Sequence, residues 1–142
     1  MFTQLTEFSA NHTLLVGAFG ALLVAVFINE FKMASRNFSR LTPAGAIQLI
    51  NNDEVALLDV REPAETTAGK ISKAIQIPVG SVGKRIGELE KHKNKNIIVY
   101  CKNGSRSALA CSELNKAGFE KVYSLGGGIM AWQEAHLPIS RK

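Results

Sequence analysis

The sequence predicts an α/β domain with a doubly wound, mostly parallel sheet, preceded by one transmembrane helix. Short apolar segments rich in β-branched residues alternate with helical stretches between residues 41 and 142. This alternation is typical of parallel strands that helices cover on both faces. A run of residues without a formal charge, residues 8–29, precedes the domain. The length of 142 residues allows one ordinary domain with an appendage, but not two full domains.

The uncharged run predicts a membrane-spanning helix at about residues 9–29. With a rise of about 1.5 Å per residue, this run is long enough for a hydrocarbon core of roughly 30 Å. A buried helix of a soluble domain normally keeps a polar stripe, whereas residues 14–28 are all apolar or glycine. A cleaved signal peptide needs a basic segment before the apolar run and a small-residue cleavage site after it, and the sequence has neither. We therefore expect residues 1–31 to form an anchored N-terminal segment.

Basic residues predict the orientation of this segment. Residues 1–31 contain no Lys or Arg, and all 17 of these residues follow. Because Lys32, Arg36 and Arg40 come directly after the apolar run, the positive-inside rule places the C-terminal domain in the cytoplasm. We expect a single-pass protein of the inner or plasma membrane. Residues 32–40 lack periodicity, and we interpret them as a basic juxtamembrane linker.

Small residues mark one face of the expected membrane helix. Gly17, Ala21 and Ala25 repeat at every fourth position, which allows two membrane helices to approach closely. Ordinary membrane-helix composition is the simpler explanation, so the sequence leaves a helix–helix partner open.

Composition argues against two other function classes. Lys and Arg are interspersed with acidic residues and lack interleaved aromatic residues, so we expect no nucleic-acid binding. Two cysteines are too few for a disulfide scaffold or a four-thiolate zinc site, and the histidines stand far apart, at His12, His92 and His136. We expect no metal and no cofactor.

The elements of the domain, residues 41–142, follow in order. Thr42 and Pro43 form an N-cap and first-turn signal for a helix that ends near Asn52. Apolar, β-rich runs predict four strands, at residues 55–60, 75–77, 97–100 and 122–125. Further helices are expected between and after these strands, at residues 82–91, 105–117 and 129–135.

The loop after residues 97–100 carries the candidate chemistry. In doubly wound folds, ligands bind where a strand leads into a helix whose first amides are unpaired. Here the strand leads into Cys101, and the loop amides, the helix dipole, Lys102 and Arg106 should all lower the pKa of the thiol. Gly104 suits a tight turn whose N–H groups point inward and bind an anion. Because no histidine lies near in sequence, we expect the loop itself to activate the thiol.

Both cysteines have a structural alternative. Cys101 could be a buried apolar residue at a strand end, but its position before a glycine-containing basic loop favours a nucleophile. Cys111 shares a helix face with Ala108 and Leu114. We therefore expect Cys111 to be a packed core cysteine rather than a resolving thiol.

Three blocks of the sequence resemble the single-domain rhodanese-type sulfurtransferases. The first combines residues 58–62 with Glu65, Gly69, Ile71, Ala74, Ile77 and Pro78. The second is the thiol loop, residues 99–107. The third combines Gly118, Phe119, Val122, residues 125–129 and Trp132. Together they extend from Leu41 to about Trp132, nearly the whole expected domain.

The resemblance implies a rhodanese-like fold and a sulfurtransferase. It implies that Cys101 takes sulfane sulfur from thiosulfate or a protein persulfide, holds it as a persulfide, and passes it to a thiophilic acceptor. The other loop residues are implied to bind substrate: Lys102, Asn103, Gly104, Ser105, Arg106 and Ser107. Asp59, Arg61 and Glu65 are expected as scaffold partners near the site, since buried opposite charges normally pair.

Three positions depart from the family pattern. Thr66 stands where an aromatic residue is common, Lys70 where histidine is usual, and Lys73 where glycine is usual. All three lie outside the thiol loop, so they concern local packing and substrate contacts of that segment more than the chemistry.

Loop length and loop content separate the possible functions. Related phosphatases and arsenate reductases resemble C-x5-R, whereas residues 101–106 are C-x4-R, and the smaller ring favours sulfur over a tetrahedral oxyanion. A second hypothesis is a rhodanese-like interaction module that recruits a partner at the membrane with little or no catalysis. The presence of Cys101, Gly104 and Arg106 favours catalysis.

Overall fold

The computed structural model describes residues 2–34 and 38–141. The chain divides into two compact units, residues 1–36 and residues 37–142. The second unit contains the sheet and all the candidate site residues, and each unit is described by itself below.

The N-terminal unit consists of two helices, α1 (Phe2–Asn11) and α2 (Thr13–Ala34). At their junction, the hydroxyl group of Thr13 donates a hydrogen bond to the carbonyl of Ala10 at 3.1 Å. The uncharged run is therefore shared by two helices instead of forming one. Within the described part of the chain, no helix is both long and apolar enough to cross a membrane. The transmembrane helix expected at about residues 9–29 is thus not supported.

The segment between the two units differs from the linker expected at residues 32–40. Helix α2 continues to Ala34, and strand β1 (Ser39–Leu41) pairs in parallel with β5 (Val122–Leu125), the last strand along the chain. Residues 35–37, including Arg36, lie outside the described residues. Strand β1 is short and mostly exposed, so its backbone pairing requires no apolar periodicity that the sequence could have shown.

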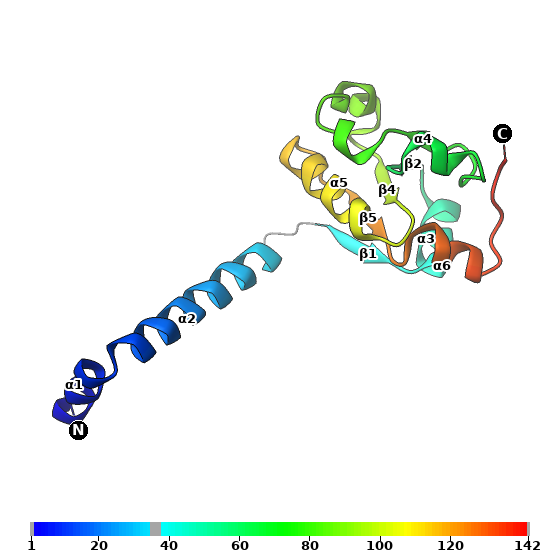
Figure 1. Ribbon diagram of the computed structural model, residues 1–142. Helices are drawn as coiled ribbons and strands as arrows, with labels where there is room; N and C mark the ends of the chain where they lie inside the picture. Colours follow the sequence, from blue (N-terminus) through cyan, green and yellow to red (C-terminus); the bar gives the residue numbers. More distant parts are fainter. Residues whose placement is uncertain (1, 35–37, 142) are drawn as a thin grey trace. The chain divides into compact units, whose positions relative to one another are not determined.

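The second unit is built on one parallel sheet of five strands, in the order β1-β5-β4-β2-β3 (Figure 1). The remaining strands are β2 (Val55–Asp59), β3 (Ile75–Gln76), β4 (Asn96–Tyr100) and β5 (Val122–Leu125). Every strand pair is parallel. The four predicted strands and the parallel sheet are confirmed.

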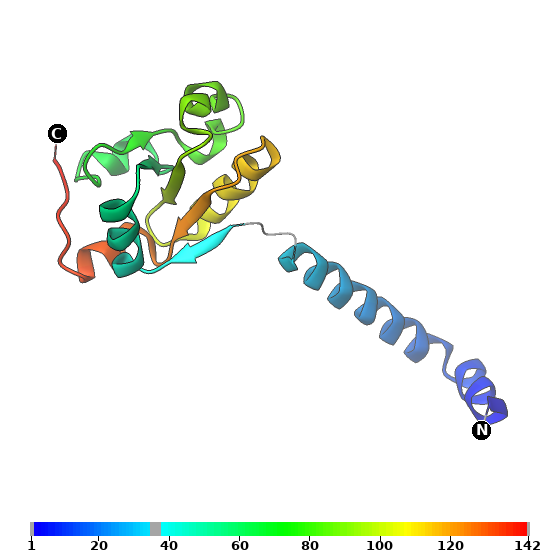
Figure 2. The same ribbon diagram turned by 180° about the vertical axis from the view of Figure 1, so that it is seen from behind.

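Helices cover both faces of this sheet, as Figure 2 shows from behind. Helices α3 (Pro43–Asn52) and α6 (Gly128–Glu134) pack on one face and α5 (Ser105–Lys116) on the other, while the short helix α4 (Pro63–Thr66) follows β2. Thr42 caps α3 as predicted, since its side-chain oxygen accepts a hydrogen bond from the Gly45 amide at 3.1 Å. The helix predicted at residues 82–91 is wrong in type. That region forms the 3-10 helices η1 (Val79–Ser81) and η2 (Ile86–His92), and glycines within it weaken a regular α-helix.

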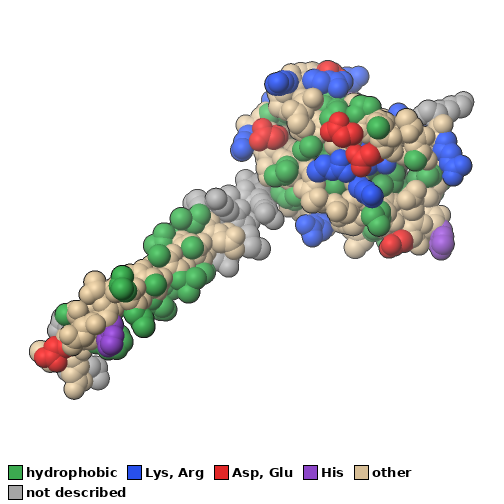
Figure 3. Space-filling view, viewed as in Figure 1, with side chains coloured by type: hydrophobic (Ala, Val, Ile, Leu, Met, Phe, Trp, Pro, Cys, Tyr) green, Lys and Arg blue, Asp and Glu red, His purple; other side chains and the backbone are tan. Residues whose placement is uncertain are grey.

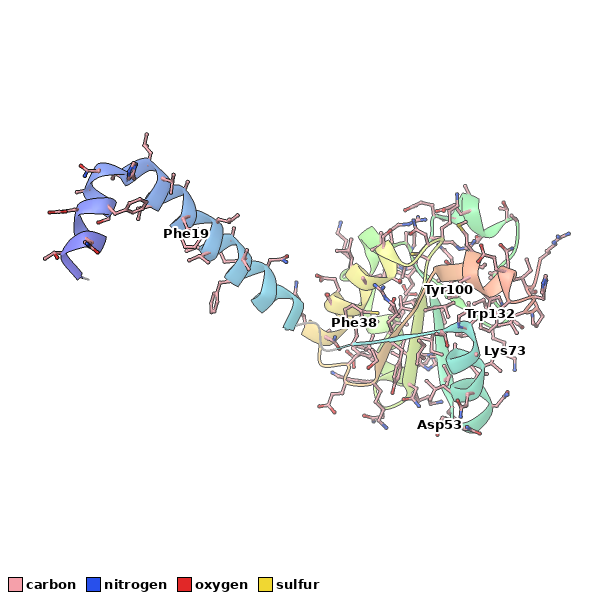
Figure 4. All side chains as sticks on the ribbon, turned by 90° about the horizontal axis from the view of Figure 1, so that it is seen from below. Phe19, Phe38, Asp53, Lys73, Tyr100 and Trp132 are labelled. Carbon is pink, nitrogen blue, oxygen red and sulfur yellow. The ribbon has the colours of Figure 1, made fainter. Side chains whose placement is uncertain are left out.

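Two hydrophobic clusters form the core, one on each face of the sheet. Leu58, Val99 and Leu114 belong to the cluster beneath α5. Ile98 and Trp132 belong to the cluster beneath α3 and α6. Because alternate residues of β4 enter different clusters, this strand is buried on both faces and its C-terminal end is firmly held. Figure 4 labels Tyr100, the last residue of β4, and Trp132 within the domain.

The departures from the family pattern have distinct backbone roles. Lys73 has a φ of 63°, in the left-handed region that favours glycine, and Figure 4 labels it. Lys70 forms an antiparallel bridge with Ser140, in which the two amides donate to the two carbonyls at 2.8 and 2.7 Å. The lysine at position 73 therefore carries a backbone strain that glycine would avoid.

Candidate active site

The candidate loop joins the end of β4 to the start of α5. Cys101 follows the last residue of β4 and is fully buried. Gly104 is the N-cap of α5 with a φ of 100°, a left-handed conformation that glycine adopts without strain. Its backbone N–H donates to the Sγ of Cys101 at 3.0 Å. The loop thus turns back on itself and directs an amide at the sulfur.

The surroundings of Cys101 favour the thiolate. Burial alone raises the pKa of the Cys101 thiol. Hydrogen bonds from the backbone amides of Ser107, Gly104 and Asn103 outweigh burial, so the net pKa is lower than its ordinary value. The predicted activation by loop amides therefore has a structural basis, without a histidine as base.

Helix α6 holds the outer side of this loop. The amide of Ile129 donates to the carbonyl of Cys101 at 2.8 Å, and the amide of Met130 donates to the carbonyl of Lys102 at 3.2 Å. Gly128 has a φ of 60°, and a Cβ there would lie 2.5 Å from both carbonyl oxygens. The start of α6 therefore fixes two carbonyl groups of the loop. The amides of the loop itself are left to face the sulfur of Cys101. The three consecutive glycines at residues 126–128, the last of which begins α6, were the sequence signal for this support.

Side chains of the loop also stabilise its shape. The hydroxyl group of Ser107 donates to the carbonyl of Gly104 at 3.0 Å and lies 2.9 Å from the hydroxyl oxygen of buried Ser124. The Oδ1 of Asn103 accepts from the amide and the hydroxyl group of Ser105, at 3.2 and 2.9 Å. Of the six predicted substrate-binding residues, Ser107 and Asn103 thus have an evident loop-stabilising role. Lys102, Asn103 and Ser105 are exposed to solvent.

Arg106 forms an ion pair with Glu65. Its two terminal nitrogens donate to the two carboxylate oxygens at 2.7 and 2.8 Å. The same carboxylate accepts the amide of Glu62 at 2.9 Å. Hydrogen bonds from Arg106, and then from the Glu62 amide, lower the pKa of Glu65 to about 2. A predicted substrate-binding residue and a predicted scaffold residue are therefore direct partners.

Asp59 and Arg61 form the expected scaffold pair. The Nε and Nη2 of Arg61 donate to the Asp59 carboxylate, with the shortest distance 2.6 Å, and both residues are buried. Arg61 also donates to the carbonyls of Glu65 and Gly69, at 3.3 and 2.9 Å. This network fixes the segment after β2, and Glu65 of that segment pairs in turn with Arg106 of the thiol loop.

Tyr100 is a buried polar residue that the sequence analysis did not single out. Its hydroxyl oxygen accepts the amide of Ile71 at 3.1 Å. Burial, together with the nearby charge of Asp59, raises the pKa of the phenol, so it stays neutral. Only its position beside a reactive cysteine could have indicated it, since Tyr is common in strands.

A cavity of about 250 Å³ lies beside the loop. Its lining combines charged groups with an apolar wall, and includes Arg61, Glu65, Ala68, Lys102, Ile129 and Met130. The cavity brings together the residues after β2, the thiol loop and the start of α6, and is large enough for a small substrate.

Cys111 is a residue of α5 and is buried in the core cluster beneath that helix, as expected for a core cysteine. Burial, with a smaller effect from Cys101, raises its pKa to about 12. The surroundings of the two thiols therefore act in opposite directions, since those of Cys101 favour the thiolate and those of Cys111 disfavour it.

Comparison with known protein families agrees with this geometry. Residues 42–135 match the model of the rhodanese-like domain. The chain belongs to the rhodanese-like domain family. A sulfurtransferase of Allochromatium vinosum is 38% identical over 92 residues, which cover 65% of this chain and 84% of that protein. Relatives that carry the name sulfurtransferase support a general sulfurtransferase role for this rhodanese-like domain.

Another relative aligns with the N-terminal unit as well as with the domain. The protein YibN of Escherichia coli is 33% identical over 139 residues, which cover 97% of each chain. Among solved structures, a rhodanese-related protein of Thermoplasma volcanium has a TM-score of 0.67 and is 30% identical, covering 74% of this chain and all of that one. The similarity to YibN thus extends over nearly the full chain, whereas the similarity to the Thermoplasma volcanium structure covers about the length of the rhodanese-like domain.

Proposed function

We propose that this protein is a sulfurtransferase that carries sulfane sulfur as a persulfide on Cys101. The observation that best supports this is the Gly104 amide at 3.0 Å from the Cys101 Sγ, within a loop whose amides lower the pKa of the thiol. Such a loop stabilises negative charge on a sulfur atom without a separate base.

The proposed reaction consists of two displacement steps. The Cys101 thiolate attacks the outer sulfur of thiosulfate or of a protein persulfide, and the sulfite ion or the donor thiolate leaves with the electron pair of the broken S–S bond. The outer sulfur of the resulting Cys101 persulfide is then attacked by a thiophilic acceptor such as cyanide, which regenerates the thiolate. Neither step needs an external oxidant, reductant, metal or cofactor.

Substitution of Cys101 tests the proposal. We expect Cys101→Ser to abolish sulfur transfer from thiosulfate to cyanide, because the hydroxyl oxygen does not form the persulfide. Cys111→Ser is the matched control and should retain most activity, since that thiol is buried and poorly ionised. Mass spectrometry should find one added sulfur atom on Cys101 of the wild-type protein. Equal turnover by the Cys101→Ser variant would contradict the assignment.

A non-catalytic interaction module is the alternative function. The rhodanese-like domain family includes non-catalytic members, and the exposed positions of Lys102 and Ser105 leave room for a partner. The lowered pKa of Cys101 favours catalysis, because a purely structural cysteine gains nothing from a stabilised thiolate. Retention of a specific partner by Cys101→Ser, without any wild-type turnover, would favour the module.

We further propose that the N-terminal unit associates with a membrane. Large apolar side chains of α2 are exposed, including Leu14, Leu22 and Phe27, and the match to YibN includes this region. The basic residues that follow support a location of the rhodanese-like domain on the cytoplasmic side of an inner or plasma membrane. Gly17, Ala21 and Ala25 would then be available for a helix partner.

Cell fractionation tests this location. The full chain should sediment with membranes and resist extraction with alkaline carbonate, whereas residues 37–142 alone should be released into the soluble fraction. An impermeant thiol reagent added to intact cells should leave Cys101 unmodified. Release of the full chain by carbonate, or modification of Cys101 from outside, would contradict the proposed location.

A further inference from the structure

The Glu65–Arg106 pair joins the thiol loop to a distant segment. Arg106 lies in the first turn of α5 and Glu65 in the first turn of α4. They are 41 positions apart, yet both carboxylate oxygens accept from the guanidinium, at 2.7 and 2.8 Å. The Glu62 amide also donates to one of these carboxylate oxygens, at 2.9 Å. The pair is therefore held in one geometry by both elements.

The Glu65–Arg106 pair affects the net charge near the Cys101 thiol, because the carboxylate offsets the positive charge of the guanidinium. A guanidinium at the end of a cysteine loop is well suited to bind an oxyanion through two parallel N–H donors. Here, two donors of Arg106 face Glu65, which also lines the cavity beside the loop. Among the described residues that line this cavity, Arg61 and Glu65 have ion-pair partners, whereas Lys102 has none. Figure 3 shows basic and acidic side chains side by side on this unit.

We propose that Glu65 is a specificity-determining residue that neutralises Arg106, and so disfavours small dianionic sulfur donors relative to persulfides carried on thiols. This inference rests on the sulfur transfer proposed above. Without the carboxylate, the free guanidinium would attract the sulfonate oxygens of thiosulfate. With it, the cavity offers one unpaired cation, Lys102, and an apolar wall of Ala68, Ile129 and Met130, which suits the carbon chain of a thiol carrier.

The two donor classes differ in the charge that reaches the loop. Thiosulfate brings two negative charges, and its cleavage releases sulfite as a dianion. A persulfide R–S–SH gives its outer sulfur and the attached proton to Cys101 and leaves as the thiolate R–S⁻. Both reactions break one S–S bond and form another, so they differ in electrostatics and not in electron balance.

Alkylation with reagents of different charge tests the inference independently of sulfur transfer. Iodoacetate is an anion, and iodoacetamide is a neutral reagent of nearly the same size. Burial of Cys101 slows both, so the ratio of their rates isolates the charge near the thiol. In Glu65→Gln, the amide oxygen can still accept the Glu62 N–H, but Arg106 is no longer neutralised. We expect the iodoacetate-to-iodoacetamide ratio at Cys101 to rise about fivefold, and KM for thiosulfate to fall while kcat changes less.

Two further variants make the test decisive. Glu88→Gln removes a similar but exposed pair between Glu88 of η2 and Arg85, the residue before that helix, and it should leave the ratio unchanged. The double variant Glu65→Gln/Arg106→Gln should return the ratio close to the wild-type value, because it removes both charges together. Titration of the Cys101 thiolate by ultraviolet absorbance measures the same charge without reagent access, and its pKa should be lower in Glu65→Gln.

The possible results separate this inference from the proposed function. A ratio and a thiol pKa that both stay unchanged in Glu65→Gln would overturn the role of Glu65. If the ratio in the double variant is much lower than in wild type, Arg106 attracts anions even when it is paired with Glu65. That result would also overturn the role of Glu65. Neither result depends on turnover, so a protein without sulfur transfer but with the expected ratios would refute the proposed function and leave the neutralisation of Arg106 by Glu65 standing.

Discussion

The backbone amide of Ile129 donates a hydrogen bond of 2.8 Å to the carbonyl of Cys101. This contact connects the start of α6 to the residue that carries the candidate chemistry. It orients the first peptide group of the loop, and the Gly104 amide reaches the sulfur from the opposite end of the loop. The surroundings of Cys101 therefore depend on helix α6, whose residue Ile129 is 28 positions further along the chain.

Gly128→Ala should damage both stability and reactivity. A Cβ at this position would lie 2.5 Å from the carbonyl oxygens of Cys101 and Lys102, and the backbone φ is 60°. We expect the free energy of unfolding to fall by about 2 kcal/mol or more, and the Cys101 thiol pKa to rise as the loop shifts. Urea denaturation and thiolate titration measure the two effects. Gly80→Ala is the control, because nothing lies within 4 Å of its Cβ position; equal losses in both variants would refute the explanation.

Asp59→Asn should destabilise the domain strongly. Arg61 is buried, and the Asp59 carboxylate accepts two side-chain donors from it. Removing the carboxylate charge leaves a buried guanidinium only partly compensated, at a cost of about 3 kcal/mol. Chemical denaturation measures this loss. Glu88→Gln breaks an exposed pair and should cost less than about 1 kcal/mol, so a similar cost for both would argue against burial as the reason.

Lys73→Gly should stabilise the domain. The φ of 63° at Lys73 is unfavourable for a residue with a Cβ, whereas glycine adopts it freely. The larger chain entropy of glycine in the unfolded state offsets part of this gain, leaving a net stabilisation of about 0.5 to 1 kcal/mol. Thermal unfolding should show a higher midpoint. Lys84→Gly, at an exposed turn position without a positive φ, should lower it, and a lower midpoint for Lys73→Gly would contradict the strain.

Acid should weaken the Glu65–Arg106 pair in a defined pH range. The pKa of Glu65 is lowered from 4.5 to about 2. A carboxylate with a lowered pKa stabilises the folded state fully above its unfolded pKa, and this contribution disappears as pH falls through the folded value. Between pH 4.5 and about 2, wild type should therefore lose more stability than Glu65→Gln. Because Glu65 is 31% exposed, solvent screening keeps the difference small. Parallel curves for the two proteins would show that the pair does not stabilise the fold.

Local patterns predicted most of the elements of the domain. The Thr42 cap, the apolar strand runs and the strand-to-helix loop at Cys101 each depend on neighbouring residues, and the structure has all of them. Strand β1 was missed because an exposed edge strand is specified by backbone pairing with β5. The region after β3 was predicted as an α-helix, but its glycines and local packing give 3-10 turns.

The sequence by itself predicted the α/β class, the parallel sheet and the strand-to-helix loop that contains Cys101, and its three motif blocks indicated the rhodanese-like family. The fold class and the sheet follow from apolar periodicity, whereas the family follows from the resemblance of the motif blocks to known proteins. Only the tertiary structure decided that Arg106 is paired with Glu65, that α6 holds the carbonyl of Cys101, and that the uncharged N-terminal run is shared by two helices. The first two contacts join residues 41 and 28 positions apart. Such contacts exist only when parallel strands bring their C-terminal ends to one edge of the sheet.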